Sequence, residues 1–180
     1  MKIGLCIIAI FPWLIMGPVH SSGAEIIDPD EISVVAKTWH EYLDAASTNN
    51  LKKLKNLSAD RIRCLFCLEN TEVEEKEIEK CTDTDPNWYN KRYEEKVYIP
   101  INTFLQEDYP LIFTKKFIER LRARQPAYRA EHFHGQKIYG VIIQTLKPGE
   151  LSPGHEGSLY IFQFLKTEKG YQFWGIDTIP

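Results

Sequence analysis

The last third of the chain contains four segments with the alternating, aromatic-rich and β-branched pattern of strands. They span residues 128–134, 139–146, 159–165 and 171–178. The stretches between them are rich in Gly, Pro and charged residues, as turns are: 135–136, 148–157 and 168–170. Because short connections join antiparallel neighbours, this part of the chain predicts an antiparallel meander.

Helical patterns precede these strands. Asp28-Pro29-Asp30-Glu31 is a helix start, with a capping carboxylate and a proline in the first turn. Apolar residues then recur at helical spacing through Trp39 to Ala46. Further helices are predicted at about 51–57, 103–106 and 111–124, and a strand at 61–67. Helices first and strands last predict an α+β domain, in which N-terminal helices pack on a curved C-terminal antiparallel sheet.

A polar segment interrupts this order at about residues 69–95. Glu69 to Lys80 includes six glutamates, and Asp, Pro and Asn residues follow as far as Asn90. We predict an insertion or long loop with about one helical turn. An acidic run of this kind favours a solvated surface over a cation site.

The first 24 residues have the order of a secretory signal peptide. Lys2 is followed by an apolar run from Ile3 to Met16 and then by small residues at Ser22 and Ala24. The run is shorter than the roughly 20 residues that cross a membrane, and it contains Pro12. We predict cleavage after Ala24 and export to the periplasm or the extracellular space, with no membrane segment after cleavage. The alternative is an uncleaved membrane anchor.

Length and charge limit the number of domains and the class of partner of the remaining chain, residues 25–180. Its 156 residues suit one domain with a proper core. Loss of Lys2 changes the formal net charge from −3 to −4. This mild acidity argues against nucleic acid as a partner, since such binders usually carry a basic face.

Three cysteines remain after the predicted cleavage: Cys64, Cys67 and Cys81. Exported proteins meet an oxidising compartment, so a disulfide is expected. In a strand over 61–67, Cys64 and Cys67 point to opposite faces, which disfavours a bond between them. We therefore predict a Cys67–Cys81 disulfide that closes the polar insertion, with Cys64–Cys81 as the alternative. A redox pair is less favoured, because this C-x-x-C does not open a helix.

Two histidines and a loop supply the polar candidates for a site. His132 and His134 share a face of a predicted strand and are candidate binding residues, although their spacing identifies no further ligand for a metal. The stretch 147–157 places His155 beside Glu156, a candidate pair for general base catalysis. The structural interpretations, partly buried polar histidines and a structured hairpin, are favoured over these roles. We predict no metal and no cofactor.

Aromatic residues supply the apolar candidates. Tyr160 and Phe162 share one face of a strand, and Trp174 lies on the next strand. These side chains line an apolar pocket if the sheet opens away from the helices, and they form core if it does not. Core is the favoured use, and the three residues are retained as candidate binding residues.

The order of these elements resembles the cone-shaped NTF2-like superfamily: an amphipathic first helix carrying Trp39, a short second helix, another helix before the sheet, and a curved terminal meander. The stretch 150–180 also resembles small exported bacterial proteins of unassigned function. The resemblance implies a cone that encloses a pocket. The superfamily includes ketosteroid-isomerase-like enzymes with an aspartate base, but no position here matches that base. The insertion at 69–95 also exceeds the family's minimum.

Three functions remain open on the sequence. No G-x-S-x-G, Gly-rich phosphate loop or H-E-x-x-H motif occurs, so we favour a non-catalytic domain that binds an apolar small molecule or a protein. The second hypothesis is an isomerase or hydrolase with a pocket near His155 and Glu156. The third is an exported immunity or inhibitor protein whose acidic insertion contacts a basic partner.

Overall fold

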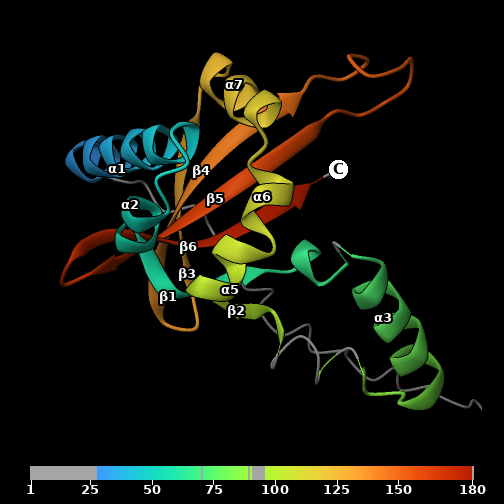
Figure 1. Ribbon diagram of the computed structural model, residues 1–180. Coiled ribbons are helices and arrows are strands. Elements are labelled where there is room, and N and C mark those ends of the chain that lie inside the picture. The colour runs from blue at the N-terminus through green and yellow to red at the C-terminus, as the bar shows by residue number, and fades with distance from the viewer. Residues whose placement is uncertain (1–27, 70, 89, 91–95, 180) are drawn as a thin grey trace, which may run out of the picture.

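The computed structural model describes residues 28–69, 71–88, 90 and 96–179. The predicted signal peptide lies outside these residues. Within them, helices lie against one face of a six-stranded, curled sheet whose strand order is β2-β1-β6-β5-β4-β3 (Figure 1). The fold is therefore α+β, as predicted. The described residues contain no helix that is both long and apolar enough to cross a membrane.

The strands confirm the predicted meander, place the strand predicted at 61–67 at Ser58–Cys64, and add one more, Tyr98–Pro100. Strands β3 (Ala127–Phe133), β4 (Gln136–Leu146), β5 (Ser158–Thr167) and β6 (Gly170–Ile179) pair in sequence order, all antiparallel. Strand β1 (Ser58–Cys64) then pairs with β6 in parallel, and β2 (Tyr98–Pro100) pairs antiparallel with β1. The sheet is thus mixed rather than purely antiparallel.

The helix α1 (Pro29–Ser47) begins as its sequence predicts. The Asp28 carboxylate accepts a hydrogen bond from the Asp30 amide at 2.9 Å and caps the helix. The apolar face of α1 is buried on the sheet, and α2 (Leu51–Asn56) follows after a turn in which Asn49 has a left-handed φ of 50°. Leu54 of α2 is also buried.

The interior between α1 and the sheet is filled by aromatic rings. The ring of Trp39 lies 4.5 Å from that of Phe162, centroid to centroid, and the ring of Tyr42 lies 4.6 Å from that of Phe173. All four side chains are at most 1% exposed. Aromatic pairs at such distances pack favourably beyond their buried area. The aromatic strand face is therefore core, the use that the sequence favoured.

The region predicted as one helix at 111–124 is two helices. After α5 (Ile101–Gln106), the short α6 (Tyr109–Ile112) ends at Phe113, and α7 (Lys115–Ala123) begins after Thr114. The Thr114 hydroxyl accepts a hydrogen bond from the Phe117 amide at 3.3 Å, which caps α7. The break turns the chain and places α6 and α7 on two sides of a groove.

The polar insertion contains more helix than predicted. After a 3-10 turn (η1, Phe66–Glu69), α3 spans 13 residues, Glu72–Thr84, and none of them is buried. Thr71 and Glu74 form a reciprocal capping box, a start signal that the run of glutamates obscured. Figure 1 shows α3 standing apart from the sheet.

One carboxylate ties the start of α1 to the sheet. Glu31 accepts a hydrogen bond from the Tyr139 hydroxyl at 2.8 Å, and it forms ion pairs with Lys137 and Lys166, each at 3.2 Å. The hydrogen bond from Tyr139, supported by those from the two lysines, lowers the pKa of Glu31 to about 2 from its ordinary 4.5. Ionised Glu31 therefore stabilises the folded state.

We expect Glu31→Gln to lower the melting temperature at pH 7 and to lose this effect in acid. Because the folded pKa is depressed, the stabilisation is present above pH 4.5 and disappears as pH falls from 4.5 toward 2. Thermal melts of wild type and variant from pH 7 to pH 3 measure this difference. Glu41→Gln, also on α1, is the control. A difference that stays constant over this range would contradict the role of Glu31.

Candidate functional site

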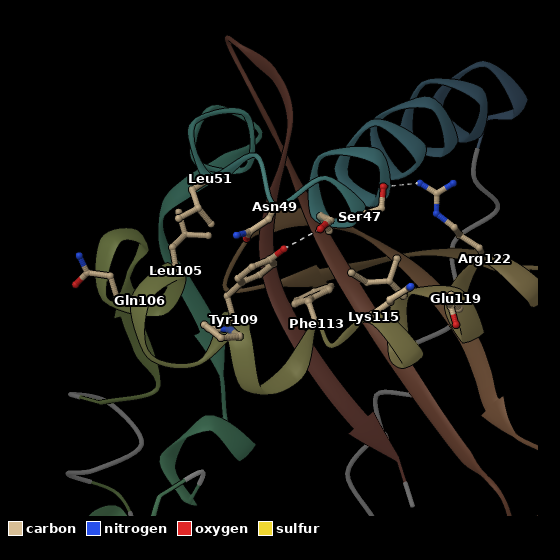
Figure 2. A pocket seen from close by; sticks show the side chains of 13 residues that line it. Ser47, Asn49, Leu51, Leu105, Gln106, Tyr109, Phe113, Lys115, Glu119 and Arg122 are labelled. Atoms are coloured by element: carbon tan, nitrogen blue, oxygen red, sulfur yellow. Dashed lines mark hydrogen bonds between the residues drawn. The ribbon is translucent and has the colours of Figure 1, made fainter.

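An open, mainly apolar pocket of about 780 Å³ lies between the end of α1 and the helices α5, α6 and α7 (Figure 2). We call it the interhelical groove. Its apolar floor consists of Ala46, Leu105, Tyr109, Phe113 and Ile118. Its rim consists of Ser47, Asn49, Leu51, Gln106, Pro110, Lys115, Glu119 and Arg122.

Local sequence signals build this groove. The α1 helix stops at Ser47, and left-handed Asn49 turns the chain into α2, so that Leu51 stands at the rim with 42% of its surface exposed. On the other side, Tyr109 donates a hydrogen bond from its hydroxyl to the Ala46 carbonyl at 3.1 Å. This bond ties α6 to the last turn of α1 and fixes the floor between them.

Two aromatic rings dominate the floor. The rings of Tyr109 and Phe113 stack with centroids 5.2 Å apart, and Figure 2 shows them between Leu105 and Leu51 on one side and Lys115 on the other. Burial raises the pKa of the Tyr109 hydroxyl, so this group stays neutral near pH 7. The floor therefore offers apolar contact without charge.

The charges of the groove are confined to its rim. Arg122 contacts the Asp44 carboxylate at 2.6 Å and the Ser47 hydroxyl at 3.2 Å. Lys115 and Glu119 also line the rim, one turn apart on α7. An apolar floor with a few polar groups at the edge, in this range of volume, is the usual composition of a small-molecule site.

The residues predicted for catalysis lie elsewhere. His155 and Glu156 belong to the β4–β5 loop, which extends past the sheet beside α7 (Figure 1). The His155 Nδ1 accepts a hydrogen bond from the Gly157 amide at 2.9 Å, and the His155 carbonyl accepts one from the Gly149 amide at 2.8 Å. His155 therefore shapes this loop, and neither residue lines the interhelical groove.

Glu150 anchors the same loop to the end of α7. Its carboxylate accepts hydrogen bonds from the Lys147 amide at 2.8 Å and from the Arg124 guanidinium at 2.7 Å. The Lys147 amide and the Arg124 charge lower the pKa of Glu150. The loop thus forms a structured hairpin, the interpretation that was favoured for this stretch.

The predicted histidine pair does not share a face. His132 lies on β3, but His134 follows the end of that strand and has a φ of 49°, in the turn to β4. Both side chains are exposed. Among the described residues, no cluster of three or more His, Cys, Asp or Glu side chains is placed to hold a metal ion.

The three predicted aromatic residues lie in different surroundings. Phe162 is in the core, and Tyr160 packs on Phe117 with ring centroids 4.7 Å apart. Trp174 packs on Tyr98 and Phe133 and lies outside the main core cluster. None of Tyr160, Phe162 and Trp174 lines the interhelical groove.

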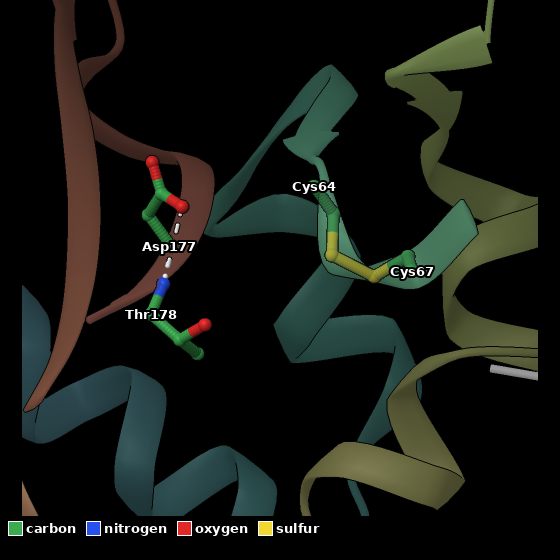
Figure 3. Close-up of a disulfide and its surroundings, with 4 residues drawn as sticks. All are labelled: Cys64, Cys67, Asp177 and Thr178. Carbon is green, nitrogen blue, oxygen red and sulfur yellow. Dashed lines mark hydrogen bonds between the residues drawn. A yellow bond between two sulfur atoms is a disulfide. The ribbon is translucent and has the colours of Figure 1, made fainter. Parts of the chain in front are cut away.

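The predicted Cys67–Cys81 disulfide is wrong. Cys67 is bonded to Cys64, with a Cα–Cα distance of 5.4 Å (Figure 3). The prediction failed because β1 ends at Cys64 and the chain turns into η1, which brings Cys67 back beside it. Both cysteines are at most 1% exposed, as is usual for a structural bond.

Sequence reasoning missed the residues of the groove. Tyr109 and Phe113 lie four residues apart, which is a helical spacing, and apolar residues at this spacing are usually core, so their pattern does not indicate a pocket. The signal available was Thr114, a capping residue inside the stretch predicted as one helix. It indicates the break that opens the groove.

The chain matches no model of a protein family and, at a significant level, no protein of curated function.

Proposed function

We propose that this protein binds an apolar small molecule in the interhelical groove and does so without catalysis. The observation that carries this proposal is the floor: five apolar side chains, two of them stacked aromatic rings, under an open volume of about 780 Å³. Burying apolar ligand surface there releases about 25 cal/mol per Å². No candidate nucleophile or general base from the sequence lies among the lining residues.

We also propose that the protein acts after export and that its fold is of the NTF2-like cone type. The signal-peptide pattern at 1–24 supports export, and the Cys64–Cys67 disulfide is compatible with an oxidising compartment.

The curled sheet covered by α1 supports the cone. The proposed ligand site differs from the interior expected of such a cone, because aromatic side chains fill that interior here.

The test uses a variant that fills the groove. Ser47 is exposed at the rim, so Ser47→Trp adds a large side chain without entering the core. We expect the neutral, environment-sensitive dye N-phenyl-1-naphthylamine to bind the wild type saturably, and Ser47→Trp to weaken this binding at least tenfold. Fluorescence titration, with excitation of the dye itself, measures both affinities.

Ser33→Trp is the matched control. Ser33 is the same residue type as Ser47, is exposed on the same helix and does not line the groove. This variant is expected to bind the dye as the wild type does. The absence of saturable binding, or equal binding by Ser47→Trp and the wild type, would refute the proposed site.

The same preparation tests export. The full chain is expressed in a bacterium and recovered from the periplasmic fraction, where we expect an intact mass that lacks residues 1–24. A full-length chain that stays in the membrane or the cytoplasm would refute the export proposal and leave the groove proposal standing.

A further inference from the structure

Two of the helices at the interhelical groove, α2 and α7, are basic, although the chain as a whole has a formal charge of −3. Helix α2 contains three lysines and no acidic residue. Helix α7 contains four basic residues and one acidic residue, Glu119. An apolar floor between two basic helices has the charge pattern that complements a molecule with an apolar body and a negative head.

Of the two cationic residues that line the groove, Lys115 and Arg122, only Arg122 forms an ion pair within the described residues. Arg122 is paired with Asp44, whereas within the described residues no acidic side chain lies within ion-pair distance of Lys115. Lys115 also opens α7, where the helix dipole is positive and a lysine is unfavourable to the helix. The side chain thus stabilises neither an ion pair nor its own helix, yet it stands beside Phe113 at the groove (Figure 2).

We propose that the ligand of the groove is an anionic amphiphile, an alkyl chain with a carboxylate or phosphate head. This inference rests on the proposed function and adds the class of ligand. The alkyl chain lies on the rings of Tyr109 and Phe113, and the ammonium group of Lys115 contacts the head. Glu119 lies one turn farther along α7, and its carboxylate repels a negative head group placed beside it.

Two ligands that have the same alkyl chain but head groups of opposite charge test whether the groove prefers a negative head. Decanoate and decyltrimethylammonium, both as monomers, are titrated into the wild type by isothermal calorimetry. We expect decanoate to bind more tightly, and octanoate less tightly than decanoate by about fourfold for each methylene buried. Equal or tighter binding of decyltrimethylammonium would overturn the assignment of a negative head.

Lys115→Gln isolates the proposed contact. It is expected to lower the affinity for decanoate about fivefold, the effect of an exposed ion pair at the upper end of the usual range. Its affinity for the neutral dye should fall less than its affinity for decanoate. Lys116→Gln is the control, because Lys116 is the next residue on α7 but does not line the groove; it should change the affinity less than twofold. Equal effects of the two variants would overturn the role of Lys115.

The outcomes separate this inference from the proposed function. Dye binding that Ser47→Trp abolishes, with no preference for decanoate, refutes the anionic head and leaves the apolar site. Binding to vesicles of anionic phospholipid, without binding of monomeric decanoate, refutes the small amphiphile and assigns the same surface to a membrane. If neither dye nor decanoate binds, both proposals fail.

Discussion

Replacement of Trp39 by alanine is expected to lower the free energy of unfolding by about 3–5 kcal/mol, the usual cost of deleting a large core side chain. Trp39 is 1% exposed and lies at the centre of the contact between α1 and the sheet. Its ring packs on Phe162, Phe164 and Tyr42 at centroid distances of 4.5, 6.4 and 6.5 Å. The deletion leaves a cavity that these neighbouring rings cannot fill by small movements.

Denaturant unfolding followed by circular dichroism measures this loss. Trp39→Phe, which keeps one aromatic ring in the site, is the control and should lose less than half as much stability. A loss below about 1 kcal/mol for Trp39→Ala would contradict the packing of α1 on the sheet, because truncation of a large side chain in a well-packed core costs about 3–5 kcal/mol.

The second large effect is expected at Gly157, where the β4–β5 loop enters β5. Its φ is +95°, and a Cβ added there would lie 2.7 Å from the Leu146 carbonyl oxygen. Because that oxygen belongs to the backbone, a side-chain rotation cannot relieve the contact. We expect Gly157→Ala to lower the free energy of unfolding by roughly 2–3 kcal/mol, from the left-handed backbone and the contact together.

Gly149→Ala separates the two causes. Gly149 lies in the same loop with a φ of +75°, but an added Cβ there meets no atom within 4 Å. This control should therefore show only the cost of the left-handed backbone, about 1 kcal/mol. Equal losses for the two variants would show that the contact with Leu146 has no effect on stability.

The elements most accurately predicted from sequence are those defined by local interactions. The start of α1 follows from Asp28 and Pro29, because a cap and a fixed φ act within one helical turn. The four strands of the meander follow from alternation and from turn residues, which act between adjacent segments. The α3 helix was underestimated because a run of glutamates obscured its capping box.

The partners of these elements were harder to predict. Nothing in residues 58–64 indicates that β1 pairs with β6 in parallel, since the two strands are more than 100 residues apart in the chain. The disulfide was assigned incorrectly because the strand was predicted to end at residue 67, whereas β1 ends at Cys64. The turn after Cys64 brings Cys67 back beside it. The candidate pair His132 and His134 separated for a similar reason, because β3 ends at Phe133.

The amino-acid sequence by itself determined the start of α1, the four strands of the meander, and that the fold is α+β. Only the tertiary structure decided that the aromatic strand face is filled by α1 and that the open apolar volume lies between α1 and α5–α7. Periodicity and caps depend on neighbours a few residues away, whereas a cavity depends on how well side chains from distant segments fill the space between them. That packing arises only when all of these segments are in place.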